Sequence, residues 1–265
     1  MVGQVARISI APVKALHVVN PDEVELTHAG VPGDRRFWLV DANRRLVNGK
    51  GHPELMRVHP RWDEASRALS LTFPDGAVVE AEVEPGEPFE ARLYGTPHPS
   101  RVVPGPWSEA LSEFAGEPVT LLWSETGAQD RGIDRGGWAS LVSRGSLVRL
   151  REQAGIAEPI DGRRFRMLFE IDGVEPHEED TWLGRRVAIG DAEILPVGDV
   201  GRCVVTTCDP DTAVSDFDSL KLLAEYRREG VTEPLPFGVY CDVAAPGRVR
   251  VGDPVRVVVV DAVPQ

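Results

Sequence analysis

Short runs of alternating apolar and polar residues, separated by turn-forming residues, recur along most of the chain. Alternation with a period of two is typical of half-buried β-strands, and Gly, Pro, Asn or Asp between the runs favours tight turns. The pattern predicts single strands at residues 6–13 and 23–30. Four longer segments contain two such runs around a turn and are predicted to form hairpins: 36–49, 68–83, 185–197 and 248–261.

Three other segments have apolar residues at helical spacing, and each is followed by a glycine that suits a helix C-cap. They are predicted to be helices at 107–116, 146–155 and 215–230. Ser146 is the expected N-cap of the second helix, and Asp216 and Asp218 suit the positive end of the third. The sequence therefore predicts a mainly β chain with a few helices, an α+β fold.

The charge balance restricts the partners that the chain can have. With 29 Lys and Arg against 42 Asp and Glu, its formal net charge is −13, which argues against binding to nucleic acid or to an anionic membrane. No apolar run approaches the roughly 18 residues that cross a bilayer. The three cysteines all follow residue 200, and an odd number does not favour a disulfide framework. We expect a cytoplasmic, soluble protein that keeps its cysteines reduced.

The short motifs of several enzyme classes are missing from the sequence. The six histidines are scattered without zinc-site spacing. There is no Gly-x-Ser-x-Gly elbow, no Walker loop and no dinucleotide fingerprint. The Gly-rich segment 130–137 is predicted to be a surface connection. Hydrolase, ATPase and nicotinamide-dependent functions are therefore disfavoured.

The segment 199–212, DVGRCVVTTCDPDT, holds two of the three cysteines and is predicted to lie on a strand. The guanidinium next to Cys203 favours a thiolate, the form that binds metals or attacks as a nucleophile. The alternative is that Cys203 is only a small buried apolar residue. Cys208 and Cys241 are expected to be buried in this way, and Asp209 to Asp211 to form a structural turn whose carboxylates cap amides.

Several cations stand inside or next to apolar segments. Lys14 is predicted to end a strand, Arg35 and Arg36 to precede one, and Arg166 to lie within another. Two interpretations remain open from the residues alone. The cations pair with internal carboxylates, or they line a pocket for an anionic ligand.

At these positions the sequence resembles the MOSC domain family, which is named for the C-terminal part of molybdenum cofactor sulfurases. The resemblance extends to the N-terminal β-barrel domain that accompanies this domain and covers nearly the whole chain. It includes the amidoxime reducing components and their bacterial counterparts. The segments that carry it are APVKA (11–15), GDRRFWLVD (33–41), RRFRMLFEIDG (163–173), DTWLGRRVAIGDAEI (180–194), VGRCVVTTCDPDT (200–212), FGVYCDV (237–243) and PGRVRVGDPV (246–255).

The chain is expected to consist of two parts, with the boundary at the loop 104–107 or at the predicted strand 118–123. With the second boundary, the resemblance implies an N-terminal β-barrel domain at 1–117 and a MOSC β-barrel domain at 118–265. It also implies molybdenum–molybdopterin as the cofactor, with Cys203 as the molybdenum ligand and catalytic residue. The implied cofactor contacts are Lys14, Arg35 (or the adjacent Arg36), Arg166, Arg202 and Tyr240. Four departures from the family pattern stand out: Ala15 for serine, Gly136-Gly137 for Thr-Ser, Leu168 for asparagine and Ala213 for glycine.

The function implied by this resemblance is the two-electron reduction of a small N-hydroxylated substrate. Because no iron–sulfur or haem domain is visible in the sequence, electrons are expected from a separate donor protein. Two alternatives remain: a sulfur-transfer protein that carries a persulfide on Cys203, and a carrier that binds the molybdenum cofactor without turnover.

Overall fold

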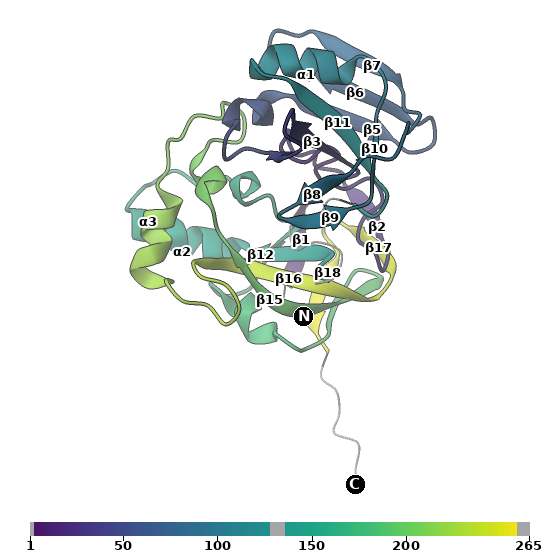
Figure 1. Ribbon diagram of the computed structural model, residues 1–265. Coiled ribbons are helices and arrows are strands. Elements are labelled where there is room, and N and C mark those ends of the chain that lie inside the picture. The colour runs from purple at the N-terminus through teal and green to yellow at the C-terminus, as the bar shows by residue number, and fades with distance from the viewer. Residues whose placement is uncertain (1–2, 128–135, 259–265) are drawn as a thin grey trace.

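The computed structural model describes residues 3–127 and 136–258. Within them the chain is built mainly of strands, with helices on two sides (Figure 1). The strands are β1 (Gly3–Ile8), β2 (Glu23–Leu26), β3 (Phe37–Asp41), β4 (Leu46–Val47), β5 (His59–Asp63), β6 (Ala68–Thr72), β7 (Val78–Glu82), β8 (Ala91–Leu93), β9 (Thr96–His98), β10 (Ser100–Val102), β11 (Val119–Ser124), β12 (Ala139–Ser143), β13 (Phe169–Asp172), β14 (Val187–Ile189), β15 (Ala192–Gly201), β16 (Pro236–Ala245), β17 (Gly247–Arg250) and β18 (Pro254–Val257). The α-helices are α1 (Trp107–Ala115), α2 (Arg144–Ala154) and α3 (Ser219–Tyr226), and the 3₁₀ turns are η1 (Pro53–Arg57), η3 (Gly162–Phe165), η4 (Glu178–Trp182) and η5 (Val204–Thr207).

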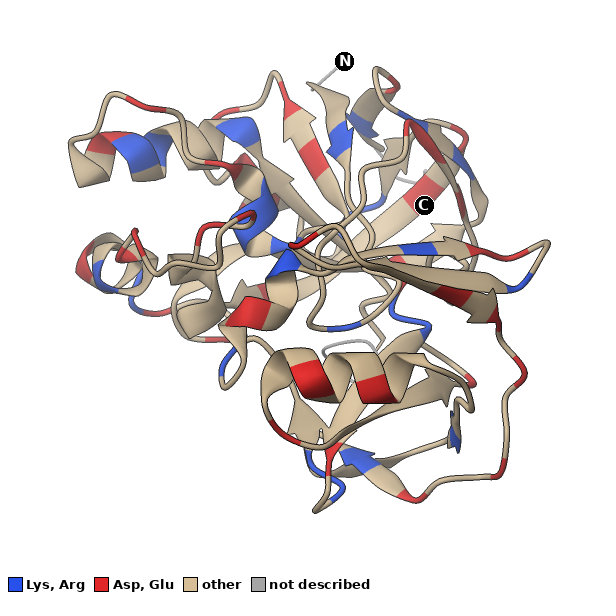
Figure 2. Cartoon of the chain, turned by 90° about the horizontal axis from the view of Figure 1, so that it is seen from above, with Lys and Arg blue, Asp and Glu red and all other residues tan. Residues whose placement is uncertain are grey.

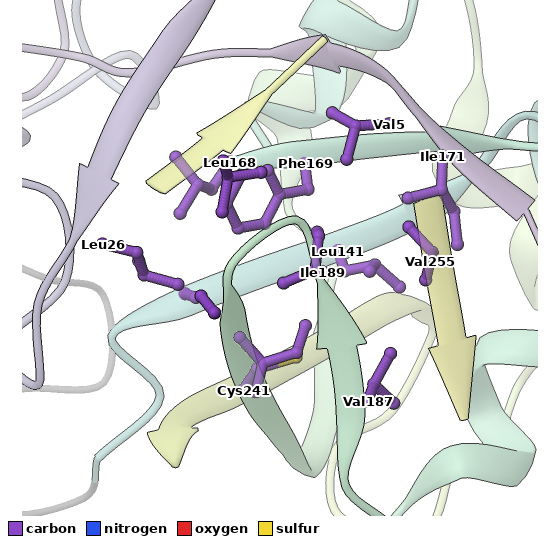
Figure 3. Packing of buried hydrophobic residues seen from close by; sticks show 14 of the residues in the cluster. Val5, Leu26, Leu141, Leu168, Phe169, Ile171, Val187, Ile189, Cys241 and Val255 are labelled. Atoms are coloured by element: carbon purple, nitrogen blue, oxygen red, sulfur yellow. The ribbon is translucent and has the colours of Figure 1, made fainter. Parts of the chain in front are cut away.

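A closed barrel forms the larger body of the fold, in the strand order β1-β13-β12-β16-β15-β14-β18. Its interior is filled by branched and aromatic side chains from alternate positions of each strand (Figure 3). Val5, Leu141, Phe169 and Val255 are among the residues that meet there. Because β1 and β18 pair, the two ends of the described chain lie on neighbouring barrel strands.

Three of the other four sheets form a second body above the barrel in Figure 1, whereas the β17-β2 sheet packs against the barrel core. The second body contains the four-stranded sheet β10-β11-β3-β4, the three-stranded sheet β5-β6-β7 and the hairpin β8-β9. The apolar face of α1, led by Trp107 and Leu111, packs into the core between these sheets. Strand β11 pairs with β3 in this body, whereas β1 pairs with β13 in the barrel. Strand pairing therefore crosses the boundary at 117/118, and the division into domains at 1–117 and 118–265 stays a prediction.

Most local predictions agree with the structure, and the mainly β fold with a few helices is confirmed. Hairpins form at β3-β4, β6-β7 and β14-β15. The predicted hairpin at 248–261 is wrong, because β17 pairs with β2 while β18 pairs with β1 and β14. Residues 259–261 of that segment lie outside the described residues, as do 130–135 of the predicted surface connection.

The three predicted helices exist, but two of their ends differ from the prediction. Gly116 and Gly155 are left-handed C-caps as expected. The N-cap of α2 is Ser143, not Ser146, because the Ser143 hydroxyl accepts the Ser146 amide. Helix α3 begins after its N-cap Asp218 and ends at Tyr226, so its predicted end at Gly230 is wrong. No helix in the described part of the chain has the length and apolar character needed to cross a membrane.

Candidate functional site

A cavity of about 240 Å³ brings together six of the seven expected site residues. They are Lys14, Arg35, Arg166, Arg202, Cys203 and Tyr240. The lining comes from both bodies of the fold, because Lys14 and Arg35 precede β3 while the others belong to the barrel half. Acidic residues are spread over both bodies (Figure 2), yet the six residues include four cations and no carboxylate.

Cys203 lies at the point where a barrel strand turns into a 3₁₀ turn. Strand β15 ends at Gly201, and Cys203 is the N-cap of η5 with an extended backbone. Its carbonyl oxygen accepts from the amide of Thr206 (3.1 Å) and from its hydroxyl (3.0 Å). The expectation of a strand through Cys203 is therefore wrong. This turn leaves the cysteine partly exposed on the cavity wall.

Arg202 ties three chain segments together directly beside Cys203. Its Nε donates to the Phe237 carbonyl oxygen (2.9 Å), which its Nη2 also contacts. Its Nη1 donates to the Phe165 carbonyl oxygen (3.0 Å), and Nη2 lies 2.8 Å from the Met167 sulfur. Charged donors to carbonyl oxygens make strong hydrogen bonds. Arg202 therefore fixes the backbone that presents Cys203, whatever else its guanidinium contacts.

Lys14 and Arg35 reach the cavity from adjacent segments of the upper body. The Lys14 amide donates to the Phe37 carbonyl oxygen (2.8 Å), and its side chain is buried with Nζ 5.3 Å from the centre of the Tyr94 ring. Arg35 has a left-handed backbone, with φ 49°. Its Nη1 lies 2.5 Å from Asp34 Oδ2, and its Nη2 donates to the Arg166 carbonyl oxygen (3.4 Å). Arg35 thereby bridges the two bodies at the cavity.

Arg36, the seventh expected residue, does not line this cavity. Its Nη1 donates to the Ser124 carbonyl oxygen (3.4 Å), and its guanidinium stacks 4.8 Å from the centre of the Trp123 ring. Its Nη2 is also 3.9 Å from Glu64. The structure thus assigns Arg35 to the cavity and Arg36 to packing against β11.

Arg166 does not lie within a strand, as predicted, but three residues before β13. It closes the 3₁₀ turn η3 in a left-handed conformation with φ 52°, and its amide donates to Arg163. Arg164, in the same turn, also lines the cavity and makes an ion pair of 2.7 Å with Asp216. Left-handed backbone in bulky residues is costly and is often found at functional sites.

Two family models match separate parts of this chain. Residues 2–98 match the MOSC N-terminal beta barrel domain, and residues 138–256 match the MOSC domain. The chain is a MOSC domain protein. It is 27% identical to mitochondrial amidoxime-reducing component 1 of Homo sapiens, over 96% of this chain and 82% of that protein.

Other similar proteins carry related descriptions. Molybdenum cofactor sulfurase of Danio rerio is 24% identical over 87% of this MOSC chain, which corresponds to 31% of that protein. Mitochondrial amidoxime reducing component 2 of Bos taurus is 26% identical over 96% of the chain and 83% of that protein. A solved structure of the YUAD protein from Bacillus subtilis covers 96% of this chain and 94% of that chain, with 12% identity and a TM-score of 0.45.

Several cavity residues of this MOSC protein were not identified from the sequence. They are Asn48, Lys50, Tyr94, Arg164 and Thr206. Asn48 and Lys50 follow β4 in an Asn-Gly-Lys-Gly stretch, a turn signal at the end of the 36–49 hairpin. No sequence signal pointed to Tyr94, which sits in the turn between β8 and β9.

The departures from the MOSC pattern have structural correlates. Gly136 and Gly137 both have positive φ, and a Cβ on Gly136 would stand 2.3 Å from Asp242 Oδ1, which accepts the Gly137 amide (2.6 Å). Leu168 is buried in the barrel core (Figure 3).

The other two cysteines are buried. Cys241 lies in the barrel core, and burial raises the pKa of its thiol. The expected burial of Cys208 and Cys241 is confirmed.

The loop after Cys203 is held by carboxylates, as expected from its Asp-Pro-Asp sequence. Asp209 Oδ1 accepts the amides of Asp211 (3.1 Å) and Thr212 (2.8 Å). Asp211 in turn pairs with Arg163 (2.7 Å) and His17 (3.1 Å). The hydrogen bonds from Arg163 lower the pKa of the Asp211 carboxyl. This loop therefore connects the barrel half to the upper body beside the cavity.

Ala213 offers a stability test of the family's glycine. Its φ is 60°, a conformation that costs an L-residue about 1–2 kcal/mol. We expect Ala213→Gly to raise the free energy of unfolding by about 0.5–1 kcal/mol, because this strain exceeds the added chain entropy of glycine. Urea denaturation measures the change. The control is Ala65→Gly in an exposed turn without positive φ, which should lower stability, and a loss in Ala213→Gly contradicts the prediction.

Proposed function

We propose that this MOSC protein is a molybdenum-cofactor-dependent oxidoreductase that reduces N-hydroxylated compounds with electrons from a separate redox protein. The observation that carries the proposal is the partly exposed Cys203 on a cavity lined by Lys14, Arg35, Arg166 and Arg202. The names of the amidoxime-reducing relatives support the activity. The cytoplasmic location and the donor protein expected from the sequence remain part of the proposal.

The cavity residues fit an anionic metal cofactor. A thiolate is a soft ligand that suits molybdenum, and guanidinium and ammonium groups suit the phosphate of a pterin. These cations gather in a chain whose net charge is −13. Their backbones are held by hydrogen bonds from both bodies of the fold, so their charges do not depend on flexible loops alone. Preorganised donors of this kind bind an anion without a large ordering cost.

We assign the chain's own residues the following roles. Cys203 supplies the sulfur ligand, and Lys14, Arg35 and Arg166 hold the anionic part of the cofactor. Arg202 keeps residues 201–203 in place through its bonds to Phe165 and Phe237. When bound, the cofactor supplies the two-electron chemistry.

The reaction balances with an amidoxime as substrate. The amidoxime gains two electrons and two protons, its N–O bond breaks, and an amidine and one water leave. The electrons come from the donor protein, or from a chemical reductant in the assay. The protons come from solvent.

The test uses wild-type protein reconstituted with the cofactor. We expect about one molybdenum per chain by metal analysis, and conversion of benzamidoxime to benzamidine with two reduced viologens consumed per product. Hydroxylaminopurine serves as a second substrate. Protein that holds molybdenum but reduces neither compound overturns the proposed activity.

The two alternatives give different results in the same preparation. A sulfur-transfer protein would carry labelled sulfane sulfur on Cys203, and this label would be lost on Cys203→Ser. A carrier would release the intact cofactor to an acceptor apoprotein during dialysis, without turnover. Stable one-to-one retention together with viologen oxidation excludes both.

A further inference from the structure

The turn between β8 and β9 contains an aromatic residue that its backbone conformation disfavours. It is a two-residue hairpin loop of Tyr94 and Gly95, with φ values of 50° and 86°. Such loops strongly favour Asn, Asp or Gly at both positions, because a bulky side chain is strained at positive φ. Tyr94 is also 51% exposed as a residue. Backbone preference and burial do not favour an aromatic residue here, and one contact that the structure gives its ring is with the Lys14 ammonium at the cavity.

Tyr94 stands at the boundary between two cavities. It lines the 240 Å³ cavity of Cys203 and a neighbouring cavity of about 1190 Å³ in the upper body. Asn48 and Lys50 also line both. In Figure 1 the β8-β9 hairpin lies between the upper sheets and the barrel. With Lys14 Nζ 5.3 Å from its ring centre, Tyr94 forms part of the wall through which the larger cavity meets the cofactor residues.

The hairpin that carries Tyr94 is anchored on the upper body. A main-chain bridge joins Arg92 to Arg45, and the Arg92 Nη1 donates to the Gly95 carbonyl oxygen (2.7 Å). The turn is therefore held in place, and the aromatic ring is presented from a fixed backbone. Strain that the surrounding structure maintains at a cavity mouth points to a function for the side chain.

The larger cavity carries an excess of positive charge. Its cations are Arg44, Arg45, Lys50 and Arg92, and its carboxylates are Glu90 and Glu125. Glu125 is already paired with Arg101 (2.9 Å). His98 also lines the cavity, and burial together with nearby Lys14 lowers its pKa, so it adds no charge at neutral pH. A cleft lined mainly by positive charges attracts negatively charged ligands.

We propose that Tyr94 selects the substrate: its ring stacks on a flat aromatic N-hydroxylated compound that enters through the larger cavity, whose cations favour a negatively charged substituent. This inference rests on the proposed function and names its substrate class. The aromatic ring of the substrate lies against Tyr94 with its N-hydroxylated group toward Cys203, and its anionic group lies among the cavity cations.

The variant Tyr94→Asn tests the stacking role without disturbing the hairpin. Asn suits the turn better than Tyr, so the melting temperature should stay equal or rise. We expect KM for benzamidoxime to rise about 3- to 10-fold at unchanged kcat, since an aromatic pair contributes binding in this range. KM for acetamidoxime, which has the same reacting group but no ring, should not change. Tyr94→Phe should behave like wild type.

Equal effects on both substrates, or no effect on either, overturn the stacking role.

The role of the cavity cations has its own test. Wild type should prefer 4-carboxybenzamidoxime over benzamidoxime in kcat/KM, and the double variant Arg45→Gln/Lys50→Gln should lose this preference. Both residues are exposed. A wild-type preference for the neutral compound overturns the charge part.

Calorimetry separates this inference from the proposed function. Binding of 4-carboxybenzamidoxime to the oxidised protein needs no turnover. If wild type binds it and Tyr94→Asn binds it about 3- to 10-fold more weakly, the inference stands even where no reduction occurs. If the two proteins bind it equally, or neither binds it, Tyr94 does not select the ligand.

Discussion

The Cys203→Ala variant should lose its bound molybdenum and at least about a hundredfold of the benzamidoxime reduction. The cavity contains this thiol among six Lys and Arg side chains, and alanine removes the sulfur without altering their charges. Loss of even an outer partner of a metal ligand costs 10–100-fold in affinity or activity, so loss of the ligand itself should cost more. Metal analysis and viologen oxidation, measured on the same preparation, check both effects.

Pterin content separates the ligand role from the role of the cations. Cys203→Ala keeps Lys14, Arg35 and Arg166, so we expect part of the pterin to remain while molybdenum is lost. The matched control is Cys208→Ala, five residues along the same segment, whose side chain is buried and does not line the 240 Å³ cavity. Cys208→Ala should retain molybdenum. One molybdenum per chain in Cys203→Ala would contradict the ligand role.

The sequence predicts those parts of the fold that depend on local pattern. Alternating runs around Pro74-Asp75-Gly76 give β6 and β7, and helical spacing gives α1 with its Gly116 cap. The failed hairpin at 248–261 has the same local form. Its two strands instead pair with β2, β1 and β14, which are distant in sequence. Pairing that closes a barrel is non-local, so a single sequence with an ambiguous turn does not reveal it.

The same limit applies around Cys203. The run Val-Val-Thr-Thr that follows it favours a strand by composition. The hydroxyls of Thr206 and Thr207 instead bond back to the carbonyl oxygens of Cys203 and Val204, and this supports a 3₁₀ turn. The Thr206 hydroxyl also contacts Ser219 at the start of α3. A contact with a helix that follows later in the chain therefore overrides the local preference.

For the site, the motifs supplied the candidate residues and the structure supplied their arrangement. The sequence alone could not choose between Arg35 and Arg36, since both precede the same strand. The choice follows from the left-handed backbone of Arg35 and from Trp123, against which Arg36 packs. Tyr94 was missed because it occupies a turn position that normally holds Asn, Asp or Gly.

The Asp34→Ala variant should lower the free energy of unfolding by about 3–5 kcal/mol. The Asp34 side chain is only 2% exposed, and it accepts both the Ala11 amide (2.7 Å) and the Arg35 guanidinium (2.5 Å). Removing one partner of a buried ion pair leaves the other charge without its compensation, which costs this amount. Urea denaturation of the cofactor-free protein at neutral pH measures the loss.

Asp34→Asn provides the matched control for this charge. Asparagine keeps one oxygen that can accept the Ala11 amide, but its NH2 group replaces the oxygen that accepts from Arg35 and the negative charge is lost. Because the backbone hydrogen bond is retained, its loss should be smaller than that of alanine. A loss below about 1 kcal/mol in Asp34→Ala would contradict the role of this ion pair. Ala11 lies three residues before Lys14, and Arg35 donates to the Arg166 carbonyl oxygen. The Asp34 carboxylate therefore holds in place the two segments that carry Lys14 and Arg35. Asp34→Ala should therefore also weaken pterin retention while Cys203 is intact.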